Sequence, residues 1–234
     1  MKHLFVQEVD CVHCQTLPCF FRKHLSADQH VDLSRHKRHV IYQKGETLVK
    51  YGNFDSNVYH INSGLIKIMV EGVNNRQSIY KLITSSDVIN FAALLANTDY
   101  YPFTAIAMKP TEVCVVRKDF IEHALLNNSE FAYQSLLRAG KEFNLFYHRM
   151  ASFSTSQTPG RLAQTLLYLH DPSFQAEDIY NYITRREIAE LGGMSLDSTL
   201  KLLNELKQDK IITTNGKRVV INDWAMLKRL ARIG

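Results

Sequence analysis

The C-terminal stretch of the chain constrains the fold most strongly, because two short helix patterns meet there at a pair of glycines. Thr184 can cap the first helix, and Glu187, three residues later, can complete a capping box. Gly192 and Gly193 end that helix, since glycine accepts the left-handed conformation that a sharp turn needs. Ser195 then caps a second helix that reaches about residue 208. The pattern predicts a helix-turn-helix.

A two-strand hairpin pattern follows this motif. Residues 211–214 and 217–221 are rich in β-branched side chains, and Asn215-Gly216 between them is a favoured hairpin turn. Lys217 and Arg218 add two cations where the wing of a winged helix would meet a phosphate backbone. Two hairpins that serve packing alone are the alternative, but the order of helix, glycine turn, helix and cationic wing argues against it. We therefore predict a winged helix-turn-helix that binds double-stranded DNA.

The second helix of this motif has two different faces. Four residues fall on the face that we expect to pack inward: Thr199, Leu202, Leu203 and Leu206. Another face, near the N-terminal end, would enter a major groove. From residue 184 to 234, ten Lys or Arg oppose six Asp or Glu, so most of the net charge of +5 lies where a polyanion would bind. The predicted DNA-binding residues are Thr184, Arg185, Ser195, Leu196, Asp197, Ser198, Leu200, Lys201, Lys217 and Arg218.

The composition is that of an ordinary globular protein with room for two domains, since 234 residues include 45% hydrophobic and 22% charged side chains. No apolar run approaches the roughly 20 residues of a membrane-spanning helix. Glu8 comes too early for a secretory signal, so we expect a cytoplasmic protein without a membrane partner. No nucleophile, base and orienting group occur together in a recognisable motif, and an enzyme is therefore not expected.

Residues 40–117 have the pattern of a β domain. Stretches such as residues 58–61 and 65–70 are alternating or β-branched, and turn signals such as Ser63-Gly64 separate them. Many short strands at this spacing predict a barrel or a sandwich.

From about Ser129 the pattern becomes helical. Apolar residues recur every seven positions in two offset series and form an a/d stripe over three heptads. A helix packed on its own domain would also account for the stripe, but its large aromatic side chains favour a dimer seam. Residues 154–160 then break the helix and form a hinge. The predicted dimer interface comprises Leu136, Ala139, Phe143, Phe146, Met150 and Phe153.

These motifs resemble those of the Crp/Fnr transcription regulators along nearly the whole chain. Residues 184–189 and 195–201 are similar to the family's helix-turn-helix signature, and residues 44–48 and 59–67 are similar to its β-roll sensor domain. The resemblance implies a homodimer on a pseudo-palindromic operator, with RNA polymerase as a further partner. It also implies an α+β fold with four parts: a cysteine-bearing segment (1–24), a β-roll of the cyclic-nucleotide-binding, jelly-roll type (25–127), a dimerisation helix and hinge (128–158) and a winged helix-turn-helix (159–234).

Two stretches depart from the family's patterns. The family often has Glu and Arg where Asp197 and Lys201 stand, and Lys lacks the two-point fork with which Arg grips guanine. The family's usual operator is therefore not assumed. In the stretch that matches the cyclic AMP cassette, residues 85–105, no Arg or Lys is present to neutralise a phosphate, and Asp99 would repel one. We therefore expect that the roll does not bind cyclic AMP.

The four cysteines are the remaining candidates for chemistry. Cys11, Cys14 and Cys19 form a C-x2-C-x4-C run, and Cys114 is the only other cysteine in the sequence. Four thiolates are a plausible ligand set for an iron–sulfur cluster. The arrangement is similar to that of the oxygen-sensing FNR branch of the family, although the second spacing here is shorter by one residue. The resemblance implies a 4Fe–4S cluster, whose loss to oxygen or nitric oxide would loosen the dimer seam.

The cysteines are also compatible with several different roles. The N-terminal three could bind zinc with His13 or His24 as fourth ligand, or two thiols could form a redox disulfide. Cys114 could be a buried apolar side chain, and the roll could hold haem or another small ligand. A group of histidines is expected on a solvent-exposed helix face that leads into the first strand: His24, His30, His36 and His39.

Overall fold

The computed structural model describes residues 4–5, 11, 14, 19–53, 57–72, 77–89, 91 and 100–234, without the side chains of residues 4, 5, 175 and 176. Two compact units are present, and each is described by itself. The first unit is Met1–Val70 with Leu82–Asn144, and the second is Glu71–Lys81 with Leu145–Gly234. The division falls inside one long helix, which the sequence-based domain limits assign to a part of its own.

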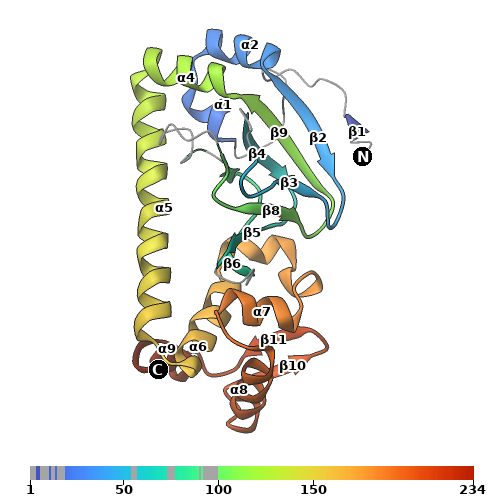
Figure 1. Ribbon diagram of the computed structural model, residues 1–234, viewed down its shortest axis with the longest axis vertical. Coiled ribbons are helices and arrows are strands. Elements are labelled where there is room, and N and C mark those ends of the chain that lie inside the picture. Colours follow the sequence, from blue (N-terminus) through green and yellow to red (C-terminus); the bar gives the residue numbers. More distant parts are fainter. Residues whose placement is uncertain are drawn as a thin grey trace. The chain divides into compact units, whose positions relative to one another are not determined.

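Two β-sheets form the centre of the β-rich N-terminal domain, as Figure 1 shows. One has the strand order β1 (Leu4–Phe5), β2 (Lys37–Tyr42), β9 (Thr111–Arg117), β4 (Asn57–Ser63) and β7 (Val88–Ile89). The other has the order β3 (Thr47–Val49), β8 (Thr104–Ala107), β5 (Ile66–Glu71) and β6 (Gln77–Ile83). The expectation of a β-rich N-terminal domain is confirmed.

Strand β9 lies in the middle of the first sheet and pairs antiparallel with both β2 and β4. Its valines are fully buried, which accounts for its β-branched sequence. The predicted turn at Ser63-Gly64 approaches the start of this strand closely. A Cβ on Gly64, whose φ is +121°, would lie 2.4 Å from Thr111 Oγ1, so only glycine fits there.

Helices α1 (Phe20–His24), α2 (Ala27–Arg35), α4 (Lys118–Asn127) and the first part of α5 (Ser129–Thr155) belong to the first unit. Ser26 and Gln29 form a capping box at the start of α2. One apolar cluster joins these helices to the sheet, and it includes Phe21, Cys114, Phe120 and Phe131. Cys114 is thus packed in the same core as the N-terminal end of α5.

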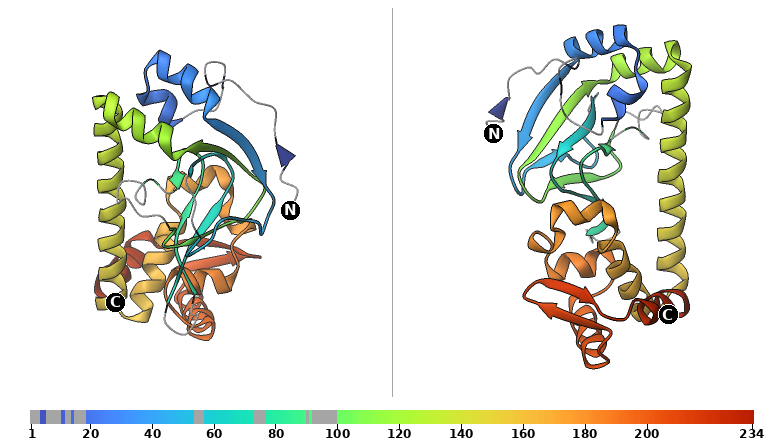
Figure 2. Two further views of the ribbon diagram at one scale, coloured as in Figure 1. Left: turned by 45° about the horizontal axis from the view of Figure 1, so that its top comes forward. Right: turned by 180° about the vertical axis from the view of Figure 1, so that it is seen from behind.

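The second unit contains the end of α5 and a small helical domain with a two-strand sheet. Its elements are α6 (Thr158–Leu169), two 3-10 turns (Pro172–Glu177 and Ile179–Asn181), α7 (Arg185–Leu191), α8 (Leu196–Gln208), β10 (Ile212–Asn215), β11 (Arg218–Ile221) and α9 (Trp224–Ile233). Figure 2 shows the β10–β11 hairpin beside α8. None of the helices in the described part of the chain is both long and apolar enough to cross a membrane.

Candidate nucleic-acid interface and cysteine cavity

The predicted capping box at the start of α7 is present. The Thr184 amide donates to Glu187 Oε2 at 2.9 Å, and the Glu187 amide donates to Thr184 Oγ1 at 3.2 Å. Helix α7 ends at Leu191 with Gly192 as its cap. Gly193 follows with a φ of +61°, and a Cβ there would lie 2.9 Å from Phe153 Cε1. Gly193 is therefore required by both its backbone conformation and the space available, whereas Gly192 has an ordinary φ of −88°.

Helix α8 begins where the sequence predicts it. Ser195 caps it by accepting the Ser198 amide at 3.1 Å, and its buried face carries Thr199, Leu203 and Leu206. The other face is open to solvent: Leu196 and Leu200 are each 40% exposed. Between and beside them lie exposed Asp197 and Lys201, so the side chains of one face could reach base edges.

The remaining predicted DNA-binding side chains flank this face. Thr184 is exposed and Arg185 is half-buried at the start of α7. Burial lowers the pKa of Arg185, and nearby Tyr180 opposes that shift. The wing carries Lys217 and Arg218, both exposed. The helix-turn-helix and the hairpin thus bring the ten predicted residues onto three adjacent elements of one unit.

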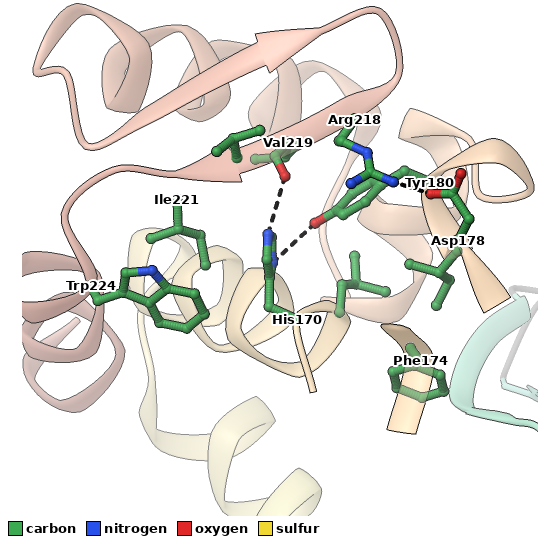
Figure 3. A pocket seen from close by; sticks show the side chains of 11 residues that line it. His170, Phe174, Asp178, Tyr180, Arg218, Val219, Ile221 and Trp224 are labelled. Carbon is green, nitrogen blue, oxygen red and sulfur yellow. Dashed lines mark hydrogen bonds and ion pairs between the residues drawn. The ribbon is translucent and has the colours of Figure 1, made fainter. Parts of the chain in front are cut away.

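The wing differs from the prediction in two respects: which residues form its turn, and whether Arg218 is free to contact DNA. Asn215 pairs with Arg218 in the ladder, so the turn residues are Gly216 and Lys217, with only the glycine at positive φ. Glycine at the first central position is typical of a type II′ turn. Arg218 does not extend freely, because its guanidinium forms an ion pair with Asp178, as Figure 3 shows.

The base of the wing is held by residues that the sequence did not single out. His170 Nε2 lies 3.1 Å from the Val219 carbonyl oxygen, and the Tyr180 hydroxyl lies 3.2 Å from His170 Nδ1 (Figure 3). Asp178 is 40 positions before Arg218. No short motif connects residues so distant in sequence, and none of them could be found before the fold was known.

A second candidate site lies in the first unit, where all four cysteines line one small cavity. Cys114 is the buried residue of β9 that stands opposite His39 of β2 on one side and His60 of β4 on the other. Cys19 precedes α1, and the amide of Cys11 donates to Ser34 Oγ at 3.0 Å. We call this the cysteine cavity; its lining is Cys11, Cys14, Cys19, Cys114, Phe21, Arg22, His30, Leu33, Lys37, His39 and Asn62.

The cysteine cavity is electrostatically unusual because a cation lies among the thiols. Burial raises the pKa of the Cys114 thiol and of the Cys19 thiol. Burial lowers the pKa of Lys37, but a hydrogen bond to Cys11 and the other thiols outweigh it, and the pKa lies above its usual value. Lys37 is therefore charged and would favour thiolate or another anion in the cavity.

A chain of polar side chains continues from this cavity into the sheet. His60 is fully buried, its Nδ1 lies 3.1 Å from Asn62 Oδ1, and the Phe20 amide donates to its Nε2 at 3.4 Å. Burial lowers the pKa of His60 to about 4, so the ring is neutral. His39 lies 3.4 Å from Glu112 Oε1 and 3.2 Å from Lys37 Nζ.

The exposed helix face expected for the histidines is wrong for His39, for His24, whose side chain is 11% exposed, and for His30, which lines the cysteine cavity. The helix ends at Arg35 and β2 begins at Lys37, which turns His39 inward to 4% exposure. Alternation along β2 places Lys37 and His39 on one face, and this signal could have found both. His24 lies 3.9 Å from Glu130, and His13 lies outside the described residues.

The spacing of the ligating side chains bears on the choice of metal. In the part of the chain that the structure describes, no three His, Cys, Asp or Glu side chains come close enough to hold one metal ion. A 4Fe–4S cluster spreads its four cysteines over four irons, so its ligands stand further apart than those of a single zinc. The free volume of about 20 Å³ suffices for one water molecule, so a cluster requires the four thiols to stand further apart than they do here.

Helix α5 presents an exposed apolar stripe that includes five of the six side chains predicted for the dimer interface. Leu136, Phe143 and Met150 are 66%, 60% and 52% exposed, whereas Ala139 is buried within its own chain. Phe146 and Phe153 are 46% and 40% exposed. Tyr133 and Tyr147, at 57% and 65%, extend the stripe. That this stripe forms a dimer seam stays a prediction.

Comparisons with known proteins agree with this architecture. Residues 39–128 match the cyclic nucleotide-binding domain family, and residues 160–230 match the Crp-like helix-turn-helix domain family. A CRP-like cAMP-activated global transcriptional regulator of Mycobacterium tuberculosis is 26% identical over 206 residues, covering 86% of this chain and 91% of that protein. The transcriptional activator protein Anr of Pseudomonas protegens is 23% identical, covering 83% of this chain and 81% of that protein.

Among solved structures, FixK2 from Bradyrhizobium japonicum superimposes with a TM-score of 0.70 at 19% identity, covering 83% of this chain and 96% of that one. This likeness shows the fold. That the roll does not bind cyclic AMP stays a prediction, since residue 90 and residues 92–99 of the matching stretch, Asp99 among them, lie outside the described residues.

Proposed function

Since the chain belongs to the Crp/Fnr family of DNA-binding transcription regulators, we propose that it is a homodimeric member that responds to oxygen or nitric oxide through a 4Fe–4S cluster on Cys11, Cys14, Cys19 and Cys114. The observation that carries the proposal is the cysteine cavity, which collects all four cysteines of the sequence. All four are free thiols.

The surroundings of the thiols support a cluster over a purely structural role. Four thiolates with such a cluster carry net negative charge, and Lys37 and Arg22 in the lining would balance it. Arg22 already donates to the Cys14 carbonyl oxygen. When bound, the cluster supplies a redox-sensitive cross-link between segments distant in sequence. A buried apolar cysteine would need neither cation.

This chain's residues offer a route from the thiols to the dimer helix. The cross-link would tie the Cys11–Cys14 segment to β9 through Cys114. Cys114 shares an apolar core with Phe120 of α4 and Phe131 of α5. Release of the segment would therefore disturb the packing at the N-terminal end of the helix that carries the seam.

The seam itself is proposed to lie on the exposed stripe of α5. Leu136, Phe143 and Met150 together with Tyr133 and Tyr147 form an apolar surface that a monomer would leave in water. A second copy of the helix, packed as in a coiled coil, would cover it. The dimer would present two α8 helices to successive half-sites of an operator, with RNA polymerase as the further partner.

Anaerobic isolation of the full chain tests the signal. We expect about four irons and four sulfides per chain and a visible absorbance band that oxygen removes, together with a dimer that loses operator affinity on exposure. Three other outcomes would each identify a different sensor. Zinc without sulfide would indicate a zinc site, a disulfide without metal would indicate a thiol switch, and bound haem would indicate a haem sensor. If strictly anaerobic protein contains none of these groups, the proposed signal is wrong, but the conclusion that the chain binds DNA is unaffected.

A further inference from the structure

A cavity of about 450 Å³ lies in the second unit beside the break between α5 and α6. Its basic lining consists of the arginines Arg149, Arg161 and Arg232 together with His148, and no Asp or Glu lines it. Ser152 and Gln164 add hydroxyl and amide groups. We call it the hinge cavity. Its volume is within the range of small-molecule sites.

Two of these cations have buried donors without acceptors. The Nε atoms of Arg149 and Arg161 are buried and make no hydrogen bond. Arg149 Nη2 donates to the carbonyl oxygens of Leu191 at 2.8 Å and Ile79 at 3.1 Å. For Arg161 no hydrogen bond or ion pair of the guanidinium is found among the described residues. Such donors have lost their hydrogen bonds to water without gaining one within the protein, which is unfavourable unless another group accepts from them.

Some cations on the surface of this unit have acidic partners. Arg186 pairs with Glu190, Arg218 with Asp178 and Lys201 with Glu205. Acidic partners are therefore supplied on the outer surface, whereas the hinge cavity concentrates cations without any in its lining. Guanidinium groups match phosphate oxygens with paired donors, and several of them around one cavity select a multiply charged anion.

We propose that the hinge cavity binds a small molecule through a phosphate or pyrophosphate group, held by Arg149, Arg161 and Arg232. The orphaned Nε donors supply contacts that no protein group makes. Arg149 also lies over the rings of Phe153 and Tyr168, 5.3 and 5.8 Å from their centroids, so its position is set before the anion arrives.

The site has a direct connection to the reading helix. Arg149 holds the carbonyl of Leu191, the last residue of α7, and Phe153 contacts the turn at Gly193. An anion that draws Arg149 inward would shift the turn that sets the direction of α8 and so change operator affinity. This effect rests on DNA binding by α8 and is independent of the cysteine cavity.

Calorimetric titration of the full-length protein with inorganic pyrophosphate, at constant ionic strength, tests the site. We expect saturable binding of one pyrophosphate per chain, at least tenfold weaker in Arg161→Gln and weakened less in Arg161→Lys, which keeps the charge. Arg229→Gln, an exposed α9 cation outside the lining, is the matched control and should bind as the wild type does. Absence of saturable binding, or equal loss in the control, would overturn the proposal.

A second arm separates a small anion from a DNA phosphate. Saturating pyrophosphate should change the operator affinity of the wild type at least threefold and that of Arg161→Gln far less. If Arg161→Gln instead lowers DNA affinity and its salt dependence while pyrophosphate does not bind, the cations contact the DNA backbone and the proposal is wrong. Should Arg161→Gln fail to fold, Arg232→Gln, on the exposed side of the cavity, carries the same expectations.

Discussion

The geometry of the winged helix depends on contacts between residues close in sequence, whereas that of the cysteine cavity depends on contacts between residues far apart in sequence. In the winged helix, Thr184 bonds Glu187 and Ser195 bonds Ser198, each three residues away. In the cysteine cavity, sheet register sets Cys114 opposite His39 and His60. A local motif can therefore form its shape alone, whereas the cavity exists only when the roll is assembled.

The largest effect should come from breaking the cavity at its strand. Cys114→Ala removes the one ligand anchored in the sheet, so iron and sulfide after anaerobic isolation should fall close to zero. Val113→Ala, beside it in β9 and equally buried, is the matched control. It should keep the cluster while losing about 2 kcal/mol of unfolding free energy from packing. Retention of iron and sulfide in Cys114→Ala would remove this cysteine from the ligand set.

The next effect concerns the buried histidine beside that strand. The pKa of His60 is about 4 in the fold and near 6.5 when unfolded, so between these values only the unfolded chain takes up the proton. The unfolding free energy of the cluster-free protein should therefore fall as pH decreases from about 6.5 to about 4, by up to roughly 3 kcal/mol from this group.

Urea denaturation at several pH values measures this dependence. His60→Gln keeps a polar side chain that cannot titrate, so its stability should fall less on acidification than that of the wild type. His39 contributes in the same direction, because burial also lowers its pKa. Identical pH profiles for the two proteins would show that His60 is not buried as a neutral ring.

How far the sequence could predict each region follows from the same contrast. The capping box, the glycine turn and the face of α8 were predictable because each depends on residues within one turn of helix. The partner of Arg218 was not, since Asp178 reaches it through tertiary packing. His39 was predicted wrongly because the helix was expected to continue past Arg35, whereas β2 begins at Lys37 and alternation along the strand turns His39 inward.

Within the winged helix, the turn can be tested for crowding as well as conformation. Gly193→Ala imposes a left-handed φ on alanine and brings its Cβ against Phe153, so about 2 kcal/mol of unfolding free energy should be lost, with weaker operator binding. Gly216→Ala has a similar φ of +56° but nothing within 4 Å, and it should lose about 1 kcal/mol. Thermal or urea unfolding measures both variants. If they lose the same unfolding free energy, crowding against Phe153 does not contribute.

The smallest effect should separate the two cations of the wing. Lys217→Ala should lower affinity for every DNA sequence a few-fold and reduce the salt-dependence slope by about one ion. Arg218→Ala should change the slope less, because Asp178 already neutralises that guanidinium. Asp178→Ala, which frees Arg218, should steepen the slope, and fluorescence anisotropy across a salt series measures all three. If Arg218→Ala and Lys217→Ala lose equally, the ion pair opens on DNA, and both cations of the wing contact phosphate.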